Sequence, residues 1–185
     1  MDVRDFLSAN IGKWFSQRTQ YEAIAQTQNS KRGEVEVTAL DATAAELVDL
    51  CQRAGLEPGR ILMGLRTQWE ADSGSLTSSR KQTGSVVVAF VAGETETRGQ
   101  LWQIRSDASD DGVVCGRYEF RPAGVNAATL LIDAETDGIS QAERLWFAGE
   151  NLRLRTIHAK AGDREQMVFY SEIRRIPLQP KTSEA

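Results

Sequence analysis

The residues best suited to chemistry in this chain are charged side chains on predicted β-strands. Residues 151–156 (NLRLRT) alternate arginine with leucine, so Arg153 and Arg155 share one face of an extended strand. If that face points into the protein, the two guanidinium groups form a pair suited to binding carboxylates. If it points outward, the arginines form a solvated stripe above inward leucines, and periodicity alone leaves both orientations open.

Two further charged residues lie on predicted strands next to large apolar side chains. Arg18 comes four residues after Trp14, so both share a strand face, unless a bulge turns Arg18 to solvent. Glu143 shares a face with Leu145 and Phe147. In an apolar cavity its carboxyl group could donate a proton when protonated, or accept hydrogen bonds from ligand N–H groups when ionised. At a strand end in water it would have no such role, and the sequence leaves this alternative open.

The aromatic and nucleophilic residues predict binding rather than covalent catalysis by this chain. Trp69 ends a predicted strand and Trp102 lies within another, where each could pack in a core or stack on a flat conjugated ligand. Cys51, Cys115 and the single His158 have no spacing typical of a disulfide framework or a metal site. We therefore expect no metal and no prosthetic group, and both cysteines to be small buried hydrophobic residues.

The elements that must position these side chains are mostly strands. Short helices are predicted over residues 2–9 and 43–53, the second with Gly55 just past its end. Runs rich in Val, Thr, Trp, Tyr and Phe predict about ten strands. They cover residues 13–26, 34–40, 61–70, 83–91, 97–106, 113–121, 129–135, 142–148, 152–160 and 165–176. A turn is predicted at residues 29–33, between the first two strands.

Short connections between consecutive strands favour an all-β, antiparallel up-and-down arrangement that closes into a barrel of the lipocalin and fatty-acid-binding type. A closed barrel of about ten strands is wider than its own side chains can fill. We therefore expect an internal cavity for a small hydrophobic ligand. This single domain is predicted over residues 1–176, followed by a disordered polar tail at residues 177–185.

Composition narrows the function classes further. The chain has 185 residues, with 22 Lys and Arg against 26 Asp and Glu, for a net charge of −4. Because the two signs are interspersed, generic nucleic-acid binding is disfavoured. No signal peptide and no membrane span is apparent, so we expect a cytoplasmic protein.

The start of the first predicted strand resembles that of lipocalin-type barrels. Gly12-Lys13-Trp14 fits their Gly-x-Trp pattern and follows a short predicted helix. In such barrels the tryptophan closes the floor, and an arginine of the last strand lies over its face. The resemblance therefore implies that Arg174 contacts Trp14.

Longer blocks resemble one family, the CpcS/CpeS-type phycobiliprotein lyases, which are chromophore lyases of cyanobacteria and algal plastids. The blocks are residues 12–19 (GKWFSQRT), 143–148 (ERLWFA), 151–156 (NLRLRT) and 169–174 (FYSEIR). They lie in the same order near both ends of the chain. The likeness therefore extends over essentially the whole sequence.

This resemblance implies a calycin-type barrel that binds a bilin, an open-chain tetrapyrrole, as substrate. The family attaches the pigment through a thioether bond to a cysteine of a phycobiliprotein α or β subunit, a component of the phycobilisome. By position, four charged residues and one aromatic match those that the family places around its chromophore: Arg18, Trp69, Glu143, Arg153 and Arg155. The match implies that Arg153 and Arg155 point inward and that Glu143 and Arg153 serve catalysis. It also implies a cyanobacterial cytoplasm or plastid stroma.

Two other functions stay open on the sequence. One is a carrier that binds a fatty acid or similar acid and performs no chemistry. The other is a non-catalytic partner of an active lyase, in a heterodimer with a paralogous subunit. A homodimer is also compatible with such a barrel.

Overall fold

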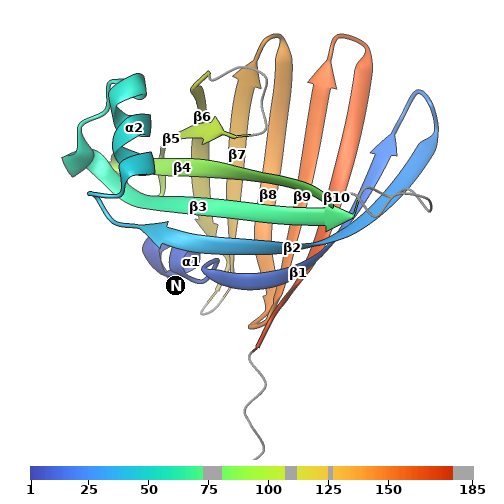
Figure 1. The fold of residues 1–185 in the computed structure, drawn as a ribbon, viewed down its shortest axis with the longest axis horizontal. Coiled ribbons are helices and arrows are strands. Elements are labelled where there is room, and N and C mark those ends of the chain that lie inside the picture. Colours follow the sequence, from blue (N-terminus) through green and yellow to red (C-terminus); the bar gives the residue numbers. More distant parts are fainter. Residues whose placement is uncertain (73–80, 107–111, 125–126, 177–185) are drawn as a thin grey trace, which may run out of the picture.

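The computed structural model describes residues 1–72, 81–106, 112–124 and 127–176. Its strands form one closed antiparallel barrel in which each strand pairs with its neighbours in chain order and the last pairs with the first (Figure 1). This confirms the predicted all-β barrel. The strands are β1 (Gly12–Glu22), β2 (Thr27–Leu40), β3 (Ile61–Asp72), β4 (Lys81–Thr95), β5 (Arg98–Arg105), β6 (Val114–Pro122), β7 (Ala128–Thr136), β8 (Ile139–Gly149), β9 (Leu152–Ala161) and β10 (Arg164–Arg174). The tail predicted at residues 177–185 lies outside the described residues.

The first hairpin differs from the prediction. Residues 29–33, predicted as a turn, belong to β2, and the chain reverses at residues 23–26, where Gln26 has a φ of 49°. The start of β2 is exposed on both faces, so it lacks the apolar alternation that marks a half-buried strand. Gly33 lies within β2, at a point where β3 comes very close. A Cβ there would lie 2.4 Å from the Glu70 carbonyl oxygen of β3, so this position requires glycine.

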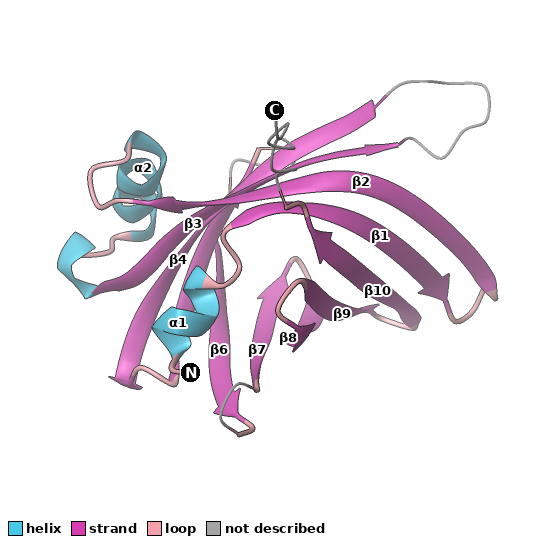
Figure 2. Ribbon diagram, turned by 90° about the horizontal axis from the view of Figure 1, so that it is seen from below, coloured by secondary structure: helices cyan, strands magenta, loops and turns pink. Residues whose placement is uncertain are grey.

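Helix α1 (Val3–Ser8) lies at one end of the barrel, within the ring of strands (Figure 2). Its start is fixed by a capping box in which the Asp2 side chain accepts from the Asp5 backbone N–H and the Asp5 side chain accepts from Asp2. Its apolar face is fully buried, and the Phe6 ring packs edge-on against Phe120 and Phe147. This end of the barrel is therefore closed by a hydrophobic core.

Helix α2 (Ala45–Ala54) packs on the outer surface of the barrel (Figure 1). Its apolar residues Leu47, Leu50 and Cys51 form a second core that includes Ala89 of β4. The helix ends at Gly55, whose φ of 64° is the left-handed conformation that glycine adopts at no steric cost. Trp102 packs against this outer core and therefore does not line the barrel interior.

The polarity of the inward-facing side chains differs around the barrel. Strands β2 to β8 contribute mainly apolar inward side chains, and these form the main core with α1. The wall made by β1, β10 and β9 is instead rich in polar and charged groups facing inward. None of the described helices is long and apolar enough to span a membrane.

Candidate functional site

The pairing of β1, β10 and β9 arranges the charged side chains of the inner wall in cross-strand rows. In the row nearest α1, Trp14 is paired with Arg174. The next row consists of Ser16, Glu172 and Arg153, and the one beyond it of Arg18, Tyr170 and Arg155. Because side chains alternate between faces, residues two apart on each strand point to the same side. The alternation predicted for Trp14 with Arg18 and for Arg153 with Arg155 is therefore present, and the burial of Trp14, Ser16, Arg153 and Glu172 shows that this face is the inner one.

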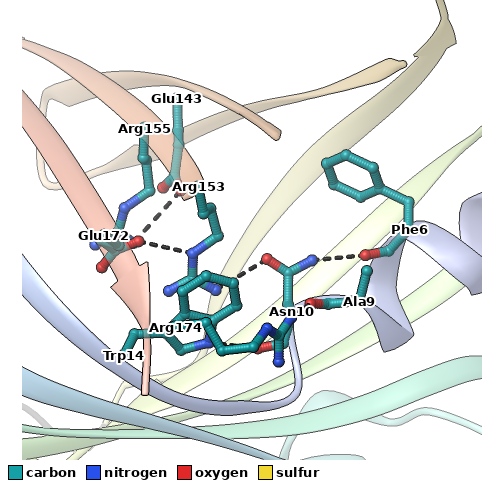
Figure 3. Close-up of polar contacts among 9 residues, drawn as sticks. All are labelled: Phe6, Ala9, Asn10, Trp14, Glu143, Arg153, Arg155, Glu172 and Arg174. Atoms are coloured by element: carbon teal, nitrogen blue, oxygen red, sulfur yellow. Dashed lines mark hydrogen bonds and ion pairs between the residues drawn. The ribbon is translucent and has the colours of Figure 1, made fainter. Parts of the chain in front are cut away.

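The first row closes the barrel floor around Trp14, which is completely buried (Figure 3). The guanidinium carbons of Arg153 and Arg174 lie 4.5 and 4.2 Å from the Trp14 ring centroid, within cation–π range. Arg174 also donates to the carbonyl oxygens of Ala9 and Ile11, which follow α1. The predicted contact between Arg174 and Trp14 is therefore confirmed.

The second row contains a buried ion pair. Arg153 Nε donates to Glu172 Oε2 at 2.7 Å, and the two side chains are 7% and 0% exposed. The Nη1 atom of Arg153 donates to the side-chain oxygen of Asn10 at 2.9 Å, and Asn10 in turn donates to the Phe6 carbonyl oxygen. The network ties β9 and β10 to the end of α1 (Figure 3).

Glu172 is ionised in this setting. Burial disfavours its charged form, but the positive charges of Arg153 and Arg155 outweigh burial and hold the pKa of Glu172 below its ordinary value. Sequence reasoning did not single out Glu172 or Asn10. The available signal was the alternation in β10, where Tyr170 and Glu172 share one strand face and Phe169, Ser171 and Ile173 share the other, which the structure exposes at Phe169 and Ile173.

The third row is more open than the second. The Arg155 side chain is 27% exposed, its guanidinium carbon lies 4.1 Å from the Tyr170 ring centroid, and its Nη1 lies 3.5 Å from Glu143 Oε1. On the other side of Tyr170, Arg18 donates from Nη2 to Gln20 Oε1 at 2.8 Å. The Nε atoms of Arg18 and Arg155 are buried and have no hydrogen-bond partner among the described residues. This row therefore retains unused donors.

Of the five residues predicted for the site, the structure brings four onto this inner wall. Arg18 comes from β1, and Arg153 and Arg155 come from β9. Glu143 joins them from β8 through Arg155 (Figure 3). Trp69 lies instead on β3, which β2 separates from β1. Its ring lies over Gly84 of the neighbouring strand, with the Arg105 guanidinium carbon 5.5 Å from the ring centroid.

Exposure inside the barrel increases away from α1. Buried residues of the second row give way to half-buried ones at Arg18, Tyr170 and Arg155, although all face the interior. A separate pocket of about 460 Å³ adjoins Trp69, Val35 and Gly84, and none of the four charged site residues lines it. We therefore place the candidate site by the contacts of the inner wall rather than by this pocket.

The cysteines do not supply a reactive thiol. Burial raises the pKa of both Cys51 and Cys115 above the ordinary thiol value, so each is protonated at neutral pH. Cys51 is a residue of α2 and is buried, as predicted, whereas Cys115 is partly exposed. Within the described part of the chain, no three His, Cys, Asp or Glu side chains are grouped to hold a metal.

A comparison with known protein families shows to which family the chain belongs. The profile of the CpeS-like protein family matches residues 2–175, which include α1 and the whole barrel. The chain belongs to the CpeS-like family. The match includes all three strands of the charged inner wall, β1, β9 and β10.

Individual relatives are similar over most of this chain, and two of them over nearly their own full length. The chain is 33% identical to a protein named chromophore lyase CpcS/CpeS from Thermosynechococcus vestitus, covering 99% of this chain and 98% of the relative. It is also 33% identical to chromophore lyase CpcS/CpeS 1 of Synechocystis, covering 96% and 92%. A protein named putative phycoerythrobilin lyase CpeS, from Microchaete diplosiphon, is 26% identical and covers 83% of this chain.

The barrel is similar to a solved CpeS-like fold. The S-type phycobiliprotein lyase CPES from Guillardia theta superposes with a TM-score of 0.81, covering 95% of this chain and 94% of that one. The two sequences are 23% identical, so this likeness supports the fold alone.

Proposed function

We propose that this CpeS-like protein is a phycobiliprotein chromophore lyase that binds a bilin inside its barrel. The pigment is then joined by a thioether bond to a cysteine of a phycobiliprotein α or β subunit. The observation that most directly supports bilin binding is the half-open row of Arg18, Tyr170 and Arg155, with Glu143 beside Arg155. The names of its relatives support the same function. We place the reaction in a cyanobacterial cytoplasm or a plastid stroma.

A bilin has chemical groups that match this wall. Its propionates are anionic at neutral pH and suit the unused guanidinium donors of Arg18 and Arg155. The Glu143 carboxylate can accept hydrogen bonds from its pyrrole N–H groups. Its conjugated rings can stack on Trp69. Arg153 already donates from Nε to Glu172 and from Nη1 to Asn10, so a propionate would bind its remaining Nη N–H groups or replace one of these two bonds.

The chemical step is an addition. The acceptor's cysteine sulfur forms a bond to the ethylidene carbon of ring A, and the thiol proton ends on the tetrapyrrole, so nothing leaves. Glu143, accepting from the pyrrole N–H groups, favours the protonated pigment, whose ethylidene carbon is more electrophilic. The barrel holds ring A in one orientation, which favours one stereochemical product and one acceptor cysteine.

Coexpression with bilin-synthesis enzymes and one apo-phycobiliprotein subunit at a time tests the proposal. We expect at least one subunit to become covalently coloured on a denaturing gel, and Arg155→Gln to reduce that colour. The matched control is Arg144→Gln, which changes an arginine of β8 that lies over Trp146 rather than on the inner row. If no subunit gains pigment above the level without this protein, the lyase proposal is wrong.

Two alternatives would give different results. A carboxylate carrier would retain a fatty acid when made without bilin, and native mass spectrometry would detect that added mass. A non-catalytic partner would colour an acceptor only when a paralogous lyase subunit is coexpressed. The second outcome also decides whether the protein acts by itself or needs a paralogous partner.

A further inference from the structure

Tyr170 lies between the two arginines of the half-open row. Its backbone is paired directly with Arg18 on one side and with Arg155 on the other. We propose that Tyr170 is a positioning residue that holds these two guanidinium groups apart so that they bind a ligand carboxylate. This inference rests on the proposed bilin function and adds to it the residue that sets the preference for carboxylates.

Contact distances support this role for the ring. The Arg155 guanidinium carbon lies 4.1 Å from the Tyr170 centroid, and that of Arg18 lies 6.0 Å away, at the outer limit for a cation–π contact. Two like charges on the same inner wall repel each other, and the aromatic face is attractive to both. An aliphatic side chain at this position would fill space without that attraction.

Arg153 is not equivalent to these two arginines. Its Nε and Nη1 donors are bonded to Glu172 and Asn10, and its charge is balanced by the Glu172 carboxylate. The Nε atoms of Arg18 and Arg155, by contrast, are buried with no partner in the described chain. Among the three site arginines, the Nε donors without a partner in the described chain therefore belong to the two on either side of Tyr170.

Glu143 does not satisfy Arg155 fully. The closest approach is 3.5 Å between Arg155 Nη1 and Glu143 Oε1, longer than a charge-assisted hydrogen bond. One carboxylate is thus shared by a row that carries two positive charges. An added ligand carboxylate completes the charge balance, and an uncharged ligand of the same shape does not.

The test compares a bilin with its dimethyl ester, in which both propionates are neutral. Each is titrated into the purified full-length protein, and binding is followed by visible absorbance. Wild-type protein should bind the free acid at least tenfold more tightly than the ester. Tyr170→Leu should weaken free-acid binding by about tenfold and leave ester binding unchanged.

Two further variants separate positioning from folding. Tyr170→Phe keeps the aromatic face and should retain the wild-type preference. Phe169→Leu alters the neighbouring residue, which is 40% exposed on the opposite face of β10, and should also behave as wild type. Unchanged ester binding by Tyr170→Leu would show that the barrel is intact.

The possible failures are distinguishable. If wild-type protein binds the acid and Tyr170→Leu keeps the full preference for it over the ester, the role of Tyr170 is overturned while bilin binding stands. If Tyr170→Leu weakens acid and ester equally, the ring is a general packing residue and the inference is wrong. If wild-type protein binds neither form, the proposed function fails together with this inference.

Discussion

At the scale of single residues, the ion pair between Arg153 and Glu172 is the buried contact whose loss should destabilise the protein. Removing one partner of a buried ion pair leaves the other charge without compensation, which costs about 3–5 kcal/mol of folding free energy. We expect Arg153→Ala to destabilise the protein by about that amount in urea unfolding. Arg153→Met combined with Glu172→Leu should recover most of the loss. A double variant as unstable as the single one would contradict this account of the pair.

The same carboxylate makes stability depend on acid. The pKa of Glu172 is lower in the folded protein than its ordinary value of 4.5, so the folded state favours the ionised form. Its contribution is therefore full above that ordinary pKa and is lost as the pH falls through the lower folded pKa. We expect wild-type protein to lose more unfolding free energy than Glu172→Gln between about pH 5 and about pH 2. Equal losses in urea titrations at several pH values would exclude this role.

How much of the site the sequence could predict differs between residues. Alternation alone placed Arg153 and Arg155 on one face but could not choose the inner one, because leucine on the other face is the more usual core residue. The family resemblance supplied the choice, and the buried position of Arg153 agrees with it. Asn10 and Glu172 were not predicted because their role depends on contacts with Arg153, which lies far from both in the sequence. The separation is 143 residues for Asn10 and 19 residues for Glu172.

For the strands, the closeness of β3 and β4 around Trp69 has a testable consequence. A Cβ at Gly84 would lie 2.4 Å from the Trp69 ring, so Gly84→Ala must displace the indole. We expect a shifted bilin absorption band and weaker binding, with a folding cost of about 1–3 kcal/mol from overpacking. Absorption spectra of bilin-loaded protein provide the measurement.

Gly59→Ala is the matched control because a Cβ there meets no atom within 4 Å. It should leave both the spectrum and the affinity unchanged. A Gly84→Ala spectrum identical to that of wild type would show that Trp69 does not contact the pigment.

Secondary structure was predictable wherever one face of an element is buried. The prediction for residues 61–70 falls within β3, and β9 was predicted to within one residue, since both have inner and outer faces of different polarity. The start of β2 was missed because both its faces are exposed and its composition is that of a turn. Its pairing with β1 is set by backbone hydrogen bonds, which leave no side-chain pattern.

Over the whole molecule, the barrel has a packed half and an open half. Helix α1 and the rings of Phe6, Trp14 and Phe147 fill one end, and the inward residues of the third row remain half-buried. Strand number and short connections predicted a closed barrel wide enough for a ligand. They could not predict which end is filled, because that depends on how α1 folds into the ring of strands.

Transfer of a preloaded bilin to an acceptor tests the central claim most directly. Purified protein is loaded with one equivalent of bilin and mixed with an apo-phycobiliprotein subunit, and both chains are weighed by intact mass spectrometry. The account predicts that the acceptor gains the mass of one bilin, faster than with free bilin, and that this chain gains no covalent mass. Pigment bound covalently to this chain, or an acceptor labelled no faster than by free bilin, would contradict it.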